Sequence, residues 1–179
     1  MLSMDTNHAM DARPPSRELP PIDERLIAPG SRYEIYDGEL AYVAPALPPH
    51  ATRHSKLSAL VETHAHPDFE VASDLLTRTS ETSDVAPDVS VYPDAEDPLT
   101  GGRQLEHLAF EIVSTERLSR ASRKAGMLAD RGVRRVFAID IEHERALEWS
   151  RSTRDWEELD PTGRIEDPRW RCRCRSPRC

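Results

Sequence analysis

The middle of the chain alternates between stretches with strand-like and helix-like spacing of apolar residues. Residues 33–43 divide into two short strands around Asp37-Gly38, a dipeptide that favours a tight hairpin turn. The other stretches are short and either alternating or continuously apolar, which is typical of strands. They cover residues 69–76, 85–92, 108–113, 135–141 and 146–151.

Two further stretches carry apolar residues at helical spacing. The first is a predicted helix of about 13 residues that begins at Thr52, with Leu57, Leu60, Val61 and His64 on one face. The second has Leu118, Ala121, Ala125 and Leu128 on one face and ends before Gly132, a residue suited to a helix C-terminus. Strands and helices in this order predict an α/β fold in which helices flank a central mixed β-sheet.

Composition separates the two ends of the chain from this middle. Residues 1–22 are rich in proline, which has no backbone N–H, so we expect a flexible Pro-rich arm. Residues 23–160 are predicted to form one domain, as a length of 179 residues suggests. Residues 161–179 are predicted to be an irregular Arg/Cys-rich tail. The tail holds all three cysteines, which lack a fourth zinc ligand nearby and are more simply incidental thiols.

Charge and hydropathy exclude several classes of protein. The net charge of −8 argues against a protein that coats nucleic acid without specificity. No apolar run approaches the ~18 residues of a membrane helix, and residues 1–13 lack the pattern of a secretory signal. We therefore expect a soluble, cytoplasmic protein with no membrane association. Locally, residues 117–135 carry seven positive charges against Asp130 alone, which suits either a phosphate-contacting surface or a solvated helix face.

The candidate chemistry starts at Glu111. All its near neighbours are apolar, as in a strand buried on both faces, and a carboxylate buried there needs a charged partner, hydrogen bonds or a metal ion. Asp88 follows Pro87 at the start of another predicted strand. If the two strands pair, Asp88 and Glu111 offer the hard oxygen ligands that suit Mg²⁺.

Lys124 lies 13 residues after Glu111 on the second predicted helix, at the edge of its apolar stripe. From there its ammonium group can reach toward the sheet and offset negative charge in phosphodiester hydrolysis. Because the position borders the core without being its centre, we expect Lys124→Ala to leave folding nearly intact.

Several short motifs occur in an order that resembles the Uma family of restriction-endonuclease-like proteins, within the PD-(D/E)XK nuclease superfamily. These are Asp-Gly-Glu-Leu at 37–40, His54, Pro-Asp-Val at 87–89, Glu-Ile-Val-Ser at 111–114, Lys124 and Gly-Val-Arg-Arg-Val-Phe-Ala-Ile-Asp at 132–140. No motif is specific alone, but the ordered set covers about 33–149.

The resemblance implies a restriction-endonuclease-like core and a metal-dependent endonuclease that hydrolyses DNA. It implies that Asp88 and Glu111 bind Mg²⁺ or Mn²⁺, that Lys124 is the catalytic lysine, and that Glu39 is a further acidic site residue. Cleavage of both strands of a duplex would favour a homodimer. The chain departs from the family pattern near the lysine, where Arg120 replaces a common aspartate and Leu128 replaces a common tyrosine.

Two alternatives remain beside the nuclease hypothesis. The departures at Arg120 and Leu128 suit a weak or inactive member of the fold that binds nucleic acid or a protein partner. Histidines suggest zinc chemistry, through the 64–68 sequence His-Ala-His-Pro-Asp or through His50 and His54 at helical spacing. The 64–68 group has no matching downstream ligands in the sequence. Pro48 and Pro49 place His50 at a bend, where a polar residue at a helix N-terminus is the simpler interpretation.

Overall fold

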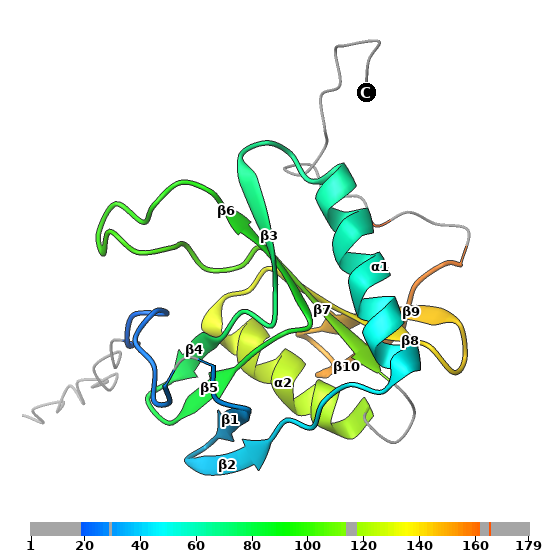
Figure 1. Ribbon diagram of the computed structural model, residues 1–179, viewed down its shortest axis with the longest axis horizontal. Coiled ribbons are helices and arrows are strands. Elements are labelled where there is room, and N and C mark those ends of the chain that lie inside the picture. Colours follow the sequence, from blue (N-terminus) through cyan, green and yellow to red (C-terminus); the bar gives the residue numbers. More distant parts are fainter. Residues whose placement is uncertain (1–18, 29, 114–117, 162–164, 166–179) are drawn as a thin grey trace, which may run out of the picture.

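The computed structural model describes residues 19–28, 30–113, 118–161 and 165. Figure 1 shows two helices packed around strands that belong to two sheets. Most of the predicted arm and tail, including every cysteine, lies outside the described residues. Neither described helix has the length and apolar character needed to cross a bilayer. The elements are β1 (Tyr33–Tyr36), β2 (Glu39–Tyr42), α1 (Pro48–His64), β3 (Phe69–Ser73), β4 (Thr77–Ser80), β5 (Ser83–Val85), β6 (Val89–Pro93), β7 (Leu108–Val113), α2 (Leu118–Arg131), β8 (Arg135–Asp140), β9 (Arg145–Ser150) and β10 (Asp155–Glu158).

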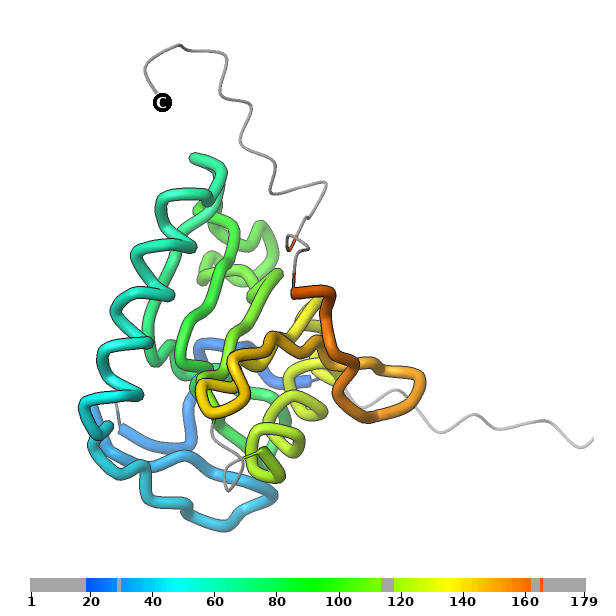
Figure 2. Tube along the Cα trace, turned by 90° about the vertical axis from the view of Figure 1, so that its right-hand side faces the viewer, coloured from blue at the N-terminus to red at the C-terminus, as the bar shows by residue number. Residues whose placement is uncertain are grey.

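The larger sheet has six strands in the order β10-β9-β8-β7-β6-β3. Strands β7 and β8 are parallel and are connected through α2, whereas the other neighbours in this sheet are antiparallel. Helix α1 packs against β3, β6 and β7, and α2 packs against β7, β8 and β9. Figure 2 shows the two helices on opposite sides of this sheet. The predicted α/β fold with a mixed sheet between helices is therefore confirmed.

A smaller antiparallel sheet, in the order β2-β1-β5-β4, lies against α2. The predicted hairpin forms its β1–β2 half, with Tyr36 opposite Glu39. Asp37 and Gly38 between them have positive φ angles of 53° and 86°, the backbone conformation that a two-residue hairpin turn requires. Strand β1 is interior to this sheet because it also pairs with β5, while β2 is an edge strand.

Strand β7 supplies the centre of the core and is buried at every position. Successive side chains of a strand point to opposite faces. Leu108 and Phe110 accordingly pack in a cluster with Val61 of α1, whereas Ala109 packs in a cluster with residues of α2. Glu111 follows this alternation onto the α2 face, so its carboxylate enters the core between the sheet and that helix.

Helix α1 differs from its prediction. It begins at Pro48, four residues before Thr52, because proline is well tolerated in the first turn, where its missing N–H has no intrahelical role. The predicted apolar stripe is only partly buried: Val61 is in the core, but Leu60 is 58% exposed. The helix therefore covers the sheet along a narrow contact.

Other differences concern strands with polar sequences. The predicted strand at 85–92 is two strands in different sheets, because Pro87 lacks the N–H needed to continue the pairing between β5 and β6. Strands β4 and β10 have no apolar periodicity and were not predicted; the predicted strand at 69–76 ends at Ser73. Helix α2 agrees with its prediction, and Gly132 follows its last residue with a φ of 124°.

Asp140, at the end of β8, provides a test of the fold away from the candidate site. Its buried carboxylate accepts hydrogen bonds from the backbone N–H groups of Glu142 and His143, from His143 Nδ1 and from Arg145 Nε. Burial acts to raise the pKa of Asp140, but these donors outweigh it and lower the pKa to about 2. A carboxylate with a lowered pKa stabilises the fold above its unfolded pKa, and that stability is lost as the pH falls through its folded pKa.

We predict that Asp140→Asn lowers the free energy of unfolding by about 1–3 kcal/mol at neutral pH. The difference from wild type should shrink as the pH falls from about 4 toward about 2. Urea unfolding at several pH values measures both effects. Asp130→Asn is the control, because the Asp130 ion pair with Arg154 is exposed and should contribute less than about 1 kcal/mol. Equal losses in the two variants would contradict the prediction.

Candidate metal centre and active site

A cleft of about 730 Å³ lies where α1, α2, β7 and the β1–β2 hairpin meet. Its lining includes three of the residues singled out in the sequence, Asp88, Glu111 and Lys124. The cleft also contains Glu34 and Asp74, which no motif in the sequence singles out. Glu39 is not among the lining residues. The cleft thus gathers four carboxylates from four separate parts of the chain, together with one lysine.

Asp88 and Glu111 are brought together by the pairing of β6 with β7. Val89 lies opposite Phe110 in this antiparallel pair, so the same register continued by one residue places Asp88 opposite Glu111. The backbone N–H of Ile112 donates a 2.6 Å hydrogen bond to Asp88 Oδ2 and fixes that carboxylate beside β7. The cause of this proximity is strand register, as the sequence analysis expected if the strands paired.

Lys124 reaches this point from the buried face of α2. Its ammonium lies 3.0 Å from Glu111 Oε1 and 2.9 Å from Glu34 Oε1, and it donates a 2.8 Å hydrogen bond to the carbonyl of Ala86. The whole residue is only 7% exposed. The structure therefore places Lys124 deeper than expected, as a buried cation held between two carboxylates.

Glu34 is the main residue that the sequence analysis missed. Besides its contact with Lys124, its carboxylate accepts hydrogen bonds from the Ala86 N–H at 2.8 Å, the Tyr36 hydroxyl at 2.8 Å and Arg120 Nη2 at 2.9 Å. Each carboxylate oxygen thus has two donors. The only sequence signal is that Glu34 shares a strand face with Tyr36, two residues away.

Glu34 and Glu111 differ in whether their carboxylate oxygens remain free to bind a metal ion. The oxygens of Glu34 are occupied by protein donors, so this carboxylate positions Lys124. Glu111 contacts Lys124 as well, but its Oε1 receives no hydrogen bond of acceptable angle from the described residues. A buried carboxylate oxygen without such a donor is costly unless another cation binds it. Glu111 is therefore the glutamate better suited to hold a metal ion.

Burial and charge set the protonation of this group. Burial raises the pKa of Glu111 to about 8, with Asp88 and Glu34 adding to the effect and Lys124 opposing it. Burial acts to lower the pKa of Lys124, but Glu111 and Glu34 outweigh it and raise that pKa, so the amine stays protonated. For Glu34, burial is again the largest influence, yet Lys124 and the hydrogen-bond donors bring its pKa below the usual value. When Glu111 is ionised, the carboxylates of Glu34, Asp88 and Glu111 outnumber the cations Lys124 and Arg120, so a bound metal ion would favour the ionised form of Glu111.

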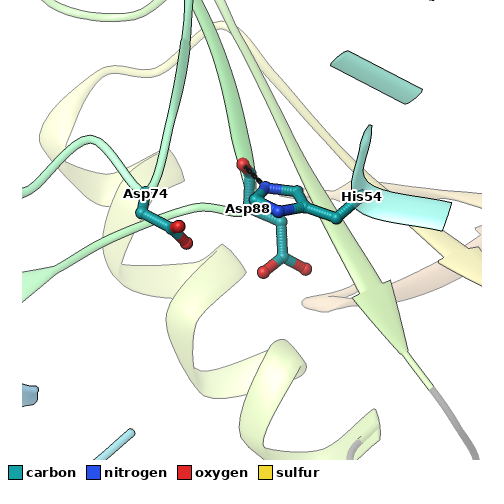
Figure 3. A group of neighbouring side chains, drawn as sticks. All are labelled: His54, Asp74 and Asp88. Atoms are coloured by element: carbon teal, nitrogen blue, oxygen red, sulfur yellow. Dashed lines mark hydrogen bonds between the residues drawn. The ribbon is translucent and has the colours of Figure 1, made fainter. Parts of the chain in front are cut away.

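A second group of potential metal ligands includes Asp88. Figure 3 shows the side chains of His54 from α1, Asp74 from the turn after β3, and Asp88 converging on one region. One potential ligand atom from each residue lies within 4.8 Å of the other two. His50, one turn before His54, places its Nε2 3.5 Å from Asp88 Oδ1. Burial acts to raise the pKa of Asp88, but His50, Lys124 and the Ile112 N–H together lower it.

These residues fit a divalent cation by their chemistry. Asp88 and Glu111 supply oxygen ligands from adjacent strands, and Mg²⁺ is commonly bound through one or two carboxylates together with substrate phosphate. Glu111 retains an oxygen without a hydrogen bond from the described residues, and no described residue donates a hydrogen bond to the Asp74 carboxylate. Carboxylate oxygens that can bind a cation are therefore available in the cleft, on Asp74, Asp88 and Glu111.

The structure also shows where Glu39, Arg120 and Leu128 lie, the other residues named from the family resemblance. Glu39 is exposed on the edge strand β2, so Glu34 is the carboxylate of the hairpin that reaches Lys124. Arg120 pairs with Glu34 and lies over the Tyr36 ring at 5.7 Å. Leu128 is fully buried in the core. The two departures from the family pattern thus belong to an ion pair at the cleft and to apolar packing.

The basic segment at 117–135 is largely neutralised within the chain, in its described part. Arg123 pairs with Asp37 at 2.8 Å, and Arg135 Nε lies 2.6 Å from Glu148 Oε1. Arg131 donates to the Pro20 carbonyl. The described arginines of this segment therefore do not form a continuous phosphate-contacting surface along α2.

The histidines at 64–66 lie apart from the cleft. His64 Nδ1 contacts the Leu60 carbonyl at 2.8 Å, as part of the last turn of α1. His66 Nδ1 lies 3.1 Å from Asp68 Oδ2 at the following turn. Neither residue is among those lining the cleft or in the group of His54, Asp74 and Asp88.

The architecture, with a mixed sheet, a helix on each face and buried carboxylates beside a lysine, defines a restriction-endonuclease-like fold. A solved structure with a similar fold is that of a putative nuclease belonging to DUF820 from Anabaena variabilis. It has a TM-score of 0.62 and 15% sequence identity, over 76% of this chain and 81% of that chain. No curated protein matches the chain.

The family model described as "Uma2: Putative restriction endonuclease" matches residues 18–168. The chain belongs to this family. The match covers all the described residues, which include Glu34, Asp88, Glu111 and Lys124. Membership in the family supports a nuclease as the general class of activity.

Proposed function

We propose that this protein is a Mg²⁺-dependent endonuclease that hydrolyses DNA phosphodiester bonds. The observation that carries the proposal is Lys124, a buried lysine held between Glu34 and Glu111 with Asp88 on the adjacent strand. A buried charge of this kind needs compensation, and with Glu111 ionised the three carboxylates exceed the two cations, Lys124 and the Arg120 that pairs with Glu34. The arrangement suits a site that also binds a divalent cation and an anionic substrate.

Each residue has a distinct role in this proposal. Asp88 and Glu111 would hold the cation, which when bound supplies Lewis-acid polarisation of the phosphoryl group. Lys124 stays protonated, so its Nζ can donate hydrogen bonds to the attacking water or to a phosphate oxygen that gains charge. Glu34 is a positioning residue, because its contacts are all to protein donors and it holds Lys124 in place.

The cleft also has features that suit a polyanionic substrate. Arg25 and Arg32 belong to its lining and are exposed, as is Arg120 at its other side. Phosphate contacts by arginine position a nucleic acid without reading its sequence. These side chains can therefore hold a DNA backbone across the cleft even though the whole chain is acidic.

The decisive experiment is cleavage of supercoiled plasmid with Mg²⁺, with Mn²⁺ and with a chelator. We expect nicked or linear product only with a divalent cation, and loss of product in Glu111→Gln. Glu39→Gln is the matched control, since Glu39 is exposed and outside the cleft. Cleavage that continues in the presence of the chelator would contradict a metal-dependent mechanism.

The alternative of an inactive binding module is favoured by one observation, the direct pairing of Arg120 with Glu34 at the cleft. In that case the protein would bind DNA in a gel-shift experiment and show no cleavage with any divalent cation. Arg120→Ala would then weaken DNA binding. Metal-dependent cleavage by wild type excludes this alternative.

A further inference from the structure

The Asp88 backbone carbonyl joins three residues that lie far apart in the sequence. It contacts His54 Nε2 and accepts a 3.3 Å hydrogen bond from the Asp74 N–H. Both neighbours are thereby held beside the Asp88 side chain, whose carboxylate is itself fixed by Ile112. The convergence visible in Figure 3 is thus built by specific contacts to one peptide group.

The contact at His54 also selects the tautomer of its ring. A carbonyl oxygen can only accept, so Nε2 carries the proton that it donates to Asp88. In a neutral imidazole the other nitrogen, Nδ1, then has a free lone pair. A histidine that binds a metal commonly donates its second ring N–H to a carbonyl in this way, which orients the ring and makes it a better ligand.

Asp74 contributes a carboxylate with no donor among the described residues. Its backbone has a positive φ of 52°, a conformation that aspartate tolerates better than most residues. This turn points the side chain toward Asp88, where two carboxylates approach each other within the 4.8 Å limit of the group. Two like charges held close together by the fold are stabilised when a cation lies between them.

We propose that His54 Nδ1 and the carboxylates of Asp74 and Asp88 form a second divalent-cation position, which shares Asp88 with the Asp88–Glu111 position. Ligands about 2.1 Å from an ion lie up to about 4.2 Å apart, so the 4.8 Å group closes with a small movement. The imidazole nitrogen favours Mn²⁺ over Mg²⁺ at this position, because Mg²⁺ prefers oxygen ligands alone. The proposal rests on the proposed function in one respect, because Asp88 would be a ligand at both cation positions.

The test is pulsed electron paramagnetic resonance of Mn²⁺ bound to the full chain, which detects a directly coordinated nitrogen as a ¹⁴N modulation. We expect this modulation in wild type and its loss in His54→Gln. His64→Gln is the control on the same helix, because His64 is exposed and contacts Leu60 instead. His50→Gln tests the neighbouring imidazole, which lies near Asp88 Oδ1.

A bound Mn²⁺ without nitrogen modulation would overturn the proposal, as would a modulation that survives in His54→Gln and disappears in His50→Gln. Asp74→Asn provides a second measurement that does not alter the helix. It should weaken Mn²⁺ binding about tenfold or more, since even outer partners of metal ligands contribute 10–100-fold. Asp68→Asn, at an exposed carboxylate, should leave the affinity unchanged. Equal affinity in wild type and Asp74→Asn would also overturn the proposal.

These readouts do not depend on catalysis. If nitrogen modulation is present but no DNA is cleaved, the second cation position stands and the proposed nuclease activity fails. If DNA is cleaved with Mg²⁺ but no nitrogen couples to Mn²⁺, the activity stands and the second position fails.

Discussion

Lys124→Ala is expected to abolish DNA cleavage and to destabilise the fold by about 3–5 kcal/mol. The stability loss follows because Lys124 is the buried partner of both glutamates. Without it, Glu34 loses a compensating charge, and Glu111, whose pKa is raised to about 8, loses a hydrogen-bond donor. The activity loss should appear as a fall in kcat of at least about 100-fold, as when a preorganised donor to a charged transition state is removed. The sequence predicted that Lys124→Ala would leave folding nearly intact. Because Lys124 is buried between two carboxylates, the structure predicts a loss of stability instead.

Urea unfolding and plasmid cleavage, measured where each protein is folded, separate the two effects. Arg123→Ala is the control at the adjacent residue of α2, because its pair with Asp37 is exposed and contributes at most about 1 kcal/mol. Combining Lys124→Ala with Glu34→Gln should recover part of the stability, since one buried charge is removed, without restoring cleavage. If folded Lys124→Ala protein cleaves at the wild-type rate, the catalytic role of Lys124 is wrong.

Glu111→Gln is expected to remove the rise in Tm that Mg²⁺ produces in wild type. A cation that binds only the folded state raises Tm by mass action, and the variant lacks one of the two proposed ligands. Without metal, the variant should fold well, because glutamine keeps the shape of the side chain and Lys124 retains its contact with Glu34. Cleavage should fall by at least about 100-fold, which corresponds to about 2.7 kcal/mol of activation free energy.

Thermal melting with and without Mg²⁺ tests this prediction, with Glu39→Gln as the control that keeps the full shift. Mn²⁺ should still raise the Tm of Glu111→Gln through His54, Asp74 and Asp88, a group that this substitution leaves intact. An unchanged Mg²⁺ shift in Glu111→Gln would mean that the ion binds elsewhere.

The amino-acid sequence by itself determined the elements whose local pattern and tertiary role agree. The apolar run of β7 with Glu111 at its fourth position, the stripe and C-terminal glycine of α2, and the Asp37-Gly38 turn were all predictable. In each case, short-range rules of periodicity and backbone conformation decide the outcome. Once β6 and β7 are neighbours in the sheet, their register places Asp88 opposite Glu111.

Only the tertiary structure decided which carboxylates surround Lys124. Glu34 and Glu39 lie in the same hairpin, and Tyr36 faces Glu39 across it. Glu34 is on the interior strand β1, next to Ala86, whereas Glu39 is on the edge strand beside the turn. Sequence periodicity distinguishes the two faces of a strand but does not reveal which strand will be covered by a neighbour.

The same reasoning applies to His54 and Asp74, which lie 34 and 14 residues from Asp88 in sequence. Their meeting depends on where α1 crosses the start of β6 and on the turn after β3, and no local pattern encodes either placement. Long-range packing brings them to the Asp88 carbonyl, and the hydrogen bonds made there fix their orientation. The chemistry of the residues could be read from the sequence, but their assembly into one site required the packing of the helix on the sheet.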